Sequence, residues 1–189
     1  MLRIRYNAPV TLTFALFCSL LLALDSLLRL GLIPALFSVP GRGGFNASSL
    51  FSYVRLVTHV AGHSSWAHLL NNFAFILLLG PILEEKYGSS TLLAMIFLTA
   101  LATGILNILF FPTGLLGASG IVFMMILLVS FTNIRSGEIP LTFILVVILY
   151  LVREIFATFN NDNDISEFAH IIGGLSGSLF GFLRPAGKS

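Results

Sequence analysis

A serine between small residues stands inside one of the most apolar stretches of the chain. The segment LLGASGIVFMM runs from Leu115 to Met125 and contains Ser119. A serine hydroxyl becomes a nucleophile when a neighbouring base takes its proton, and histidine titrates near neutral pH. His170 stands in the segment AHIIGGLSG, which is also largely apolar. The two residues could carry out acyl transfer if the fold brings them together.

His68 and Asn72 form a second polar pair, four residues apart in HSSWAHLLNN. On a helix this spacing places both side chains on one face, and both can donate hydrogen bonds to an oxyanion. We expect Ser119 to open its own helix, where backbone N–H groups lack partners and the helix dipole favours negative charge. His68 and Asn72 thus carry donors of the kind that an oxyanion hole needs, and an oxyanion would be stabilised at the start of the Ser119 helix.

The elements that position these residues must be membrane spans. Of the 189 residues, 57% are hydrophobic and 10% are charged, whereas a soluble domain carries roughly 25% charged residues. The mean hydropathy is +0.98, and a helix needs about 20 apolar residues to cross a bilayer. The sequence predicts an all-α, six-helix membrane bundle forming one domain over residues 1–189. The predicted spans are Val10–Ile33, Trp66–Leu83, Thr91–Phe111, Leu116–Thr132, Pro140–Phe159 and Phe168–Leu183.

The polar residues of three spans fall at a similar depth. At a rise of 1.5 Å per helical residue, Asn72 and His68 lie about 18 Å and about 24 Å above the inner end of their span, which is marked by Glu84. The same estimate puts Ser119 and His170 about 21 Å above the inner end of theirs. Polar groups inside a membrane are costly and usually mark a site. The shared depth predicts one site nearer the outer face.

Positive charges set the expected orientation. Six lysines and arginines fall in inner segments and four in outer ones if the N-terminus is inside. We therefore expect a multi-pass membrane protein with both termini cytoplasmic and the site open to the outer side. We expect the membrane to be a prokaryotic cell membrane. The inner residues are Arg3, Arg5, Lys86, Arg135, Arg184 and Lys188, and the outer ones are Arg29, Arg42, Arg55 and Arg153.

Small residues surround the serine and follow the histidine. Gly117 and Gly120 flank Ser119, and Gly173 and Gly177 follow His170. Such residues let two membrane helices touch backbone to backbone. We expect them to bring the fourth and sixth spans close enough for a Ser119–His170 hydrogen bond.

At these positions the chain resembles the rhomboid family of intramembrane serine proteases, along its whole six-helix length. The Gly-x-Ser-Gly motif of the family matches residues 117–120, and its Ala-His-x2-Gly-x3-Gly motif matches residues 169–177. Its His-x4-His-x3-Asn motif matches His63, His68 and Asn72, and GPILEEKYG (Gly80 to Gly88) matches the segment that follows.

The resemblance implies a Ser119–His170 dyad without an aspartate and substrates that are themselves membrane helices. It also implies an oxyanion hole built from His68, Asn72 and the Ser119 N–H. Two positions depart from the family. The Trp-Arg pair of the first outer loop is absent, since the only tryptophan is Trp66, and Phe123 stands where many relatives carry a tyrosine. Phe123 can still stack on His170.

Structural roles are expected for other polar residues. We expect His63 to tie down the outer loop, Glu84 to anchor the inner end of the second span, and Asp25 and His59 to lie at the outer interface. The stretch from Pro34 to Ser65 is expected to be an amphipathic loop lying at the interface.

Other functions fit the residues less well. The chain has no His-Glu-x-x-His pattern and its three closely spaced histidines have no carboxylate among them, so we expect no metal and no cofactor. The small net charge of +2 argues against nucleic acid. A helix-binding protein of the same fold without activity should lack the serine or the histidine, and a small transporter often shows a half-chain repeat that is absent here. The sequence leaves the oligomeric state open.

Overall fold

Helices make up nearly all the regular structure of the chain. The computed structural model describes residues 5–131, 141, 144, 145, 148, 149, 152 and 164–183. In these ranges one isolated antiparallel bridge joins Val39 and Leu115, and the other regular elements are helical. The prediction of an all-α fold is confirmed. The helices are α1 (Pro9–Leu28), α2 (Leu32–Leu36), α3 (Leu50–Thr58), the 3-10 turn η1 (His59–Ala61), α4 (Trp66–Tyr87), α5 (Ser89–Phe110), α6 (Ser119–Phe131) and α8 (Asp164–Leu183).

Three of these helices, α1, α4 and α5, are long and apolar enough to cross a membrane, and α6 and α8 contain shorter apolar stretches. Their outward faces carry exposed leucines such as Leu20 on α1, Leu78 on α4 and Leu175 on α8. Large apolar side chains on the outside of every long helix suit a lipid environment and not water. The chain is therefore an integral membrane protein. The predicted fifth span, Pro140–Phe159, falls mostly outside the described residues.

The first helix ends earlier than predicted. It stops at Leu28, because Arg29 and Gly31 both adopt a left-handed backbone with φ of +50° and +65°. Asp25 then accepts the backbone N–H of Leu32 at 2.6 Å and so caps the short helix α2. The predicted span to Ile33 was therefore too long, and Asp25 bonds within the protein.

The segment expected to be an interfacial loop contains a helix. In α3 the small and apolar side chains of Ser52 and Leu56 are buried, whereas Leu50, Phe51 and Tyr53 are exposed. An exposed row of large apolar side chains is typical of a helix that lies against lipid. The prediction of a loop was therefore wrong for α3, and the predicted place at the membrane interface stays a prediction.

Glu84 joins the start of α1 to the end of α4. Its carboxylate accepts the backbone N–H groups of Val10 and Thr11 at 2.9 and 3.1 Å, and the hydroxyls of Thr11 and Ser89 at 2.9 and 2.7 Å. The first N–H groups of a helix have no partner within it, and a carboxylate there also complements the helix dipole. A buried charge with four hydrogen bonds therefore fixes α1 and α5 to α4.

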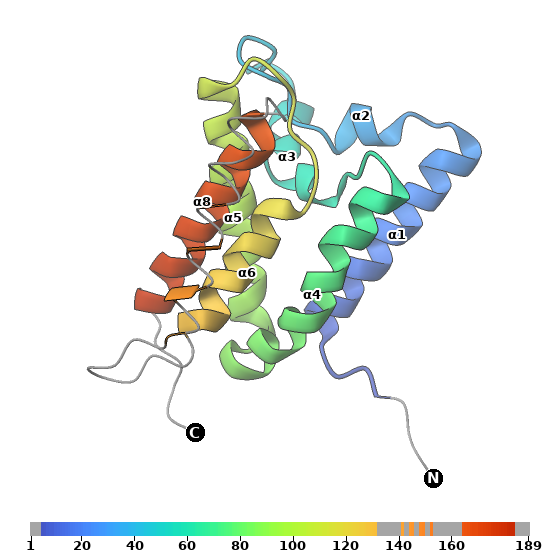
Figure 1. Cartoon of the computed structure of the whole chain (residues 1–189). Coiled ribbons are helices and arrows are strands. Elements are labelled where there is room, and N and C mark those ends of the chain that lie inside the picture. Colours follow the sequence, from blue (N-terminus) through green and yellow to red (C-terminus); the bar gives the residue numbers. More distant parts are fainter. Residues whose placement is uncertain are drawn as a thin grey trace.

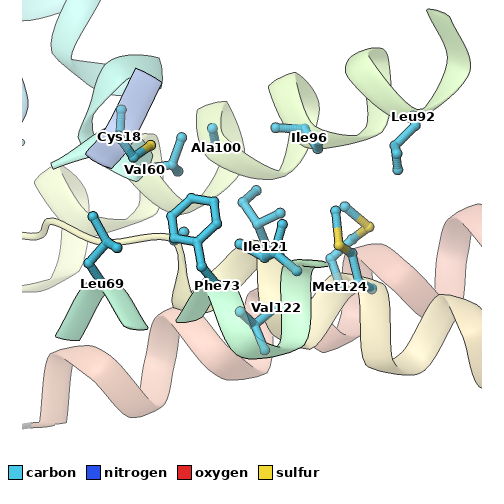
Figure 2. Packing of buried hydrophobic residues seen from close by; sticks show 14 of the residues in the cluster. Cys18, Val60, Leu69, Phe73, Leu92, Ile96, Ala100, Ile121, Val122 and Met124 are labelled. Atoms are coloured by element: carbon cyan, nitrogen blue, oxygen red, sulfur yellow. The ribbon is translucent and has the colours of Figure 1, made fainter. Parts of the chain in front are cut away.

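The catalytic candidates depend on the arrangement of the inner helices. In Figure 1, α6 begins well below the upper ends of α5 and α8, and the loop after α5 descends into the bundle to reach it. Figure 2 shows Ile121, Val122 and Met124 of α6 packed among side chains of α4 and α5. Ile121 and Met124 are fully buried. The start of α6 is therefore held inside the bundle, away from both ends.

Two glycines of α8 lie directly against the backbone of α6. A Cβ on Gly173 would fall on the carbonyl oxygen of Gly120, and a Cβ on Gly177 would fall on that of Met124. Both pairs are spaced by four residues, so one face of each helix is in register with the other. The two helices can touch this closely only because the glycines have no side chains.

Gly173→Val should lower the thermal stability of the protein, because its side chain would force α8 away from α6. Overpacking of this kind costs about 1–3 kcal/mol, equivalent to a fall in Tm of roughly 2–12 °C for a chain of this size. The measurement is thermal unfolding in detergent micelles followed by circular dichroism. Leu175→Val on the exposed face of α8 is the matched control, and an unchanged Tm in Gly173→Val would contradict the close packing.

Candidate active site

Ser119 is the first residue of α6, and Gly117 makes the turn that precedes it. Gly117 has φ of +116°, a conformation that residues with a Cβ rarely adopt. Its N–H donates to the carbonyl oxygen of His59 at 3.0 Å, and the helix begins with the bond from Val122 N–H to the Ala118 oxygen, also 3.0 Å. The N–H of Ser119 precedes that bond and has no partner within the helix. Ser119 thus offers a hydroxyl and an N–H at the positive end of the helix dipole.

A cavity of about 710 Å³ connects the polar residues of three helices. Its wall includes Ser119 from α6, Asn72 from α4 and His170 from α8. The rest of the wall is mainly apolar and includes Ala74, Phe75, Leu78, Leu79, Val122, Phe123, Ile126, Val129 and Leu149. A mainly apolar hollow with a few convergent polar groups is the usual form of a binding or active site.

Two polar side chains from α4 converge on the turn before Ser119. A Cβ built on Gly117 would lie 2.7 Å from both Cε1 and Nε2 of His68, and 3.9 Å from Nδ2 of Asn72. Nδ2 of Asn72 is buried and has no hydrogen-bond partner among the described residues. A buried, unpaired amide donor is costly. The position of Asn72 Nδ2 suits an acceptor, such as an oxyanion, that is present only when a substrate reacts.

His170 packs against the aromatic ring of Phe123. The two ring centroids are 4.2 Å apart and the planes are inclined by 36°. Phe123 lies one turn after Ser119 on α6, so the same helix carries the serine and the ring that contacts the histidine. His170 is only 7% exposed. The packing restricts the imidazole to few orientations beside the cavity.

His63 is buried and contacts His68 from the loop before α4. Its Nδ1 donates to the carbonyl oxygen of Ala61 at 3.2 Å, and its ring lies edge-on to that of His68 with centroids 5.0 Å apart. Burial lowers the pKa of the His63 imidazole to about 4, and the nearby His68 contributes to this lowering. His63 is therefore neutral at pH 7 and can pack against His68 without repelling it.

His59 is not at the interface, and that prediction was wrong. The side chain is 1% exposed, and its ring nitrogens lie 3.3 Å from the carbonyl oxygen of Arg55 and 3.3 Å from the hydroxyl of Thr103 on α5. Burial lowers the pKa of His59 to about 4, so it is also neutral at pH 7. Since its carbonyl oxygen accepts the Gly117 N–H, His59 connects α5 to the turn that positions Ser119.

The residues selected from the sequence thus fall into two groups. Ser119, Asn72, His170 and Phe123 line one cavity, and His68 lies beside Gly117, two residues before the serine. The others do not line this cavity. Glu84 lies at the opposite end of α4, and the remaining ones pack helices or loops together: His63, Gly120, Gly173 and Gly177.

Three polar residues near the cavity were not selected from the sequence. Asn71 and Ser130 line the cavity, and Ser64 lies 3.1 Å from the ring of His68. Ser64 is four residues before His68, a spacing that could have indicated a contact. Asn71 precedes Asn72 and is exposed, and no pattern in the sequence indicated that it lines the cavity. No group of three histidine, cysteine, aspartate or glutamate side chains that could hold a metal occurs in the described part of the chain.

Comparison with known proteins matches most of the chain to one family. Residues 50–186 match the Rhomboid domain. The chain is 28% identical over 142 residues to the Rhomboid protease GlpG of Yersinia pestis, a match that covers 73% of this chain and 50% of that protein. It is 33% identical over 137 residues to the Rhomboid-like protease 3 of Toxoplasma gondii, covering 69% and 51%. The chain spans about half the length of the curated relatives it matches.

Proposed function

Because the chain belongs to the rhomboid family, we propose that it is an intramembrane serine endopeptidase. Its substrates would be membrane proteins cut in or next to their transmembrane helices. The observation that carries the proposal is the cavity that Ser119 shares with His170 and with the unpaired amide of Asn72. These three groups supply the nucleophile, base and oxyanion donor that acyl transfer requires.

The reaction follows from the roles of these groups. His170 takes the hydroxyl proton of Ser119 as Oγ attacks the scissile carbonyl carbon. The carbonyl oxygen becomes an oxyanion, which accepts hydrogen bonds from the Ser119 N–H, His68 Nε2 and Asn72 Nδ2. His170 then gives the proton to the leaving amine, and an acyl-enzyme remains on Ser119. Water, activated by His170, hydrolyses the ester and restores the hydroxyl.

The substrate would reach the cavity from the side. Phe75 and Leu78 of α4, together with Leu149, line the apolar part of the wall, and all three are partly exposed on the outer surface of the bundle. Apolar side chains there suit a membrane helix that arrives through lipid. A helix must also unwind before its backbone can meet Ser119, so glycine or proline near the cut should favour cleavage.

The cavity would open toward the outer side of the membrane, with both termini cytoplasmic. The bias of lysine and arginine toward the inner segments supports this orientation. In Figure 1, α1 begins and α8 ends at the same end of the bundle, and this is the end at which Glu84 anchors α1. We assign that end to the cytoplasmic side of a prokaryotic cell membrane.

The experiment is reconstitution of the purified protein in lipid vesicles with a panel of fluorescently tagged transmembrane substrates. Mass spectrometry of the products identifies the bond that is cut. The proposal expects cleavage in or next to the membrane segment, and faster cleavage when a glycine or proline is introduced near that bond. A protein that binds these substrates but cleaves none under any lipid composition would instead be a helix-binding member of the family.

A further inference from the structure

Two consecutive serines just before α4 each hydrogen-bond to His68, but at different atoms. Ser65 is the N-cap residue of α4, and its Oγ accepts the backbone N–H of His68 at 3.1 Å. The Oγ of Ser64 lies 3.1 Å from Nδ1 of the His68 ring. The backbone and the imidazole of His68 are therefore held by separate neighbours.

The other nitrogen of the ring faces the turn before Ser119. A Cβ on Gly117 would be 2.7 Å from Nε2 of His68. A neutral imidazole carries one proton, so one nitrogen donates and the other accepts. With the proton on Nε2, His68 offers a donor to an oxyanion. With the proton on Nδ1, it offers a lone pair there, which would repel the same oxygen.

We propose that Ser64 is a positioning residue that selects the Nε2–H form of His68 by donating its hydroxyl proton to Nδ1. The hydrogen bond made by one ring nitrogen sets the tautomer of the other. Within the described residues, Nδ1 of His68 is the one acceptor in hydrogen-bond distance of the Ser64 hydroxyl. A hydroxyl with this single acceptor favours an unprotonated Nδ1.

The surroundings of the His68 ring include a second histidine and solvent. His63 lies edge-on to His68, with centroids 5.0 Å apart, and blocks one side of the ring. Ser64 itself is exposed, so water competes for Nδ1. Loss of the Ser64 hydroxyl should therefore leave the His68 ring in place but free to adopt either tautomer. This inference rests on the proposed function, since the tautomer matters to catalysis only if an oxyanion forms beside Gly117.

A pair of variants with the same shape isolates the hydroxyl. Ser64→Val should lower kcat for a reconstituted transmembrane substrate by roughly 5-fold to 50-fold, less than the roughly 10²-fold to 10³-fold expected when an oxyanion donor is lost outright. Its KM should stay unchanged because the hydrogen bond from His68 to the oxyanion forms mainly in the transition state. Ser64→Thr keeps the hydroxyl and should restore kcat to within about 2-fold of wild type.

A second measurement determines the tautomer of His68 and does not depend on enzymatic activity. The ¹⁵N chemical shifts of the imidazole rings are recorded at neutral pH in full-length Ser119→Ala protein labelled at histidine, and the His68 signals are assigned by their loss in His68→Gln. We expect the Nε2–H form when position 64 is the native serine and in Ser64→Thr, and a shift toward Nδ1–H in Ser64→Val. Ser65→Ala, which removes the cap, should lower Tm by about 2–4 °C without this tautomer change.

The two readouts separate the inference from the function on which it rests. An Nδ1–H form in the protein with Ser64 intact, or an unchanged tautomer in Ser64→Val, would overturn the role of Ser64. Equal kcat in the Ser64→Val and Ser64→Thr variants of an active enzyme would overturn it as well. If the tautomer depends on Ser64 but the wild-type protein cleaves no substrate, the positioning contact stands and the proposed protease function fails.

Discussion

Replacing Ser119 or His170 by alanine should reduce cleavage of a reconstituted substrate by at least roughly 10⁴-fold. In the proposed mechanism, Ser119 supplies the atom that attacks the carbonyl, and His170 supplies the base that makes this atom nucleophilic. The two act as a unit, so Ser119→Ala/His170→Ala should be little worse than either single variant. Cleavage is measured with purified protein under conditions in which wild type is saturated with substrate.

Correct folding must be shown for each inactive variant. Neither alanine introduces a larger side chain between α6 and α8, so the Tm values should stay close to that of wild type. Ser176→Ala is the matched serine control, because that hydroxyl bonds within α8 to the carbonyl oxygen of Ile172 at 2.8 Å. Residual activity of Ser119→Ala comparable to wild type, in protein purified without other proteases, would rule out the serine mechanism.

Asn72→Ala should lower kcat by roughly 10²-fold to 10³-fold, or less if His68 and the Ser119 N–H compensate. The amide Nδ2 is buried, unpaired among the described residues and 3.9 Å from the position of a Cβ on Gly117. Its hydrogen bond would form mainly with the oxyanion, so KM should change little. Steady-state kinetics across pH provide the measurement, and the ascending limb should persist because His170 still acts as base.

The neighbouring asparagine is the control for this prediction. Asn71 lines the same cavity and is next to Asn72 in the sequence, but its side chain is exposed. Asn71→Ala should not reproduce the loss of kcat. A large rise in KM for Asn72→Ala with kcat intact would indicate that Asn72 binds substrate, and unaltered kinetics would leave it only a role in packing α4 against α6.

The members of the candidate site could be predicted because polar residues are rare and costly inside a membrane span. Ser119, His170, Asn72 and His68 were identified from residue type, spacing and depth, together with the family resemblance of their motifs. The sequence also predicted that Gly173 and Gly177 lie on one face of α8, because they are four residues apart.

Contacts between distant segments could not be read in the same way. His59 looks like an ordinary loop histidine until Thr103, 44 residues later, is found beside its ring. The early end of α1 depends on the left-handed conformation of Arg29, a residue type that carries no signal for it. The role proposed for Ser64 follows only when Nε2 of His68 is seen next to Gly117.

The central claim is that Ser119 is a nucleophile activated by His170. It is tested most directly by treating the purified protein with a fluorophosphonate, which reacts with activated serines, and locating the adduct by mass spectrometry. We predict an adduct on the peptide that contains Ser119 in wild type, and little or none in a folded His170→Ala variant. An unlabelled wild type, an adduct on another serine, or equal labelling without His170 would contradict it.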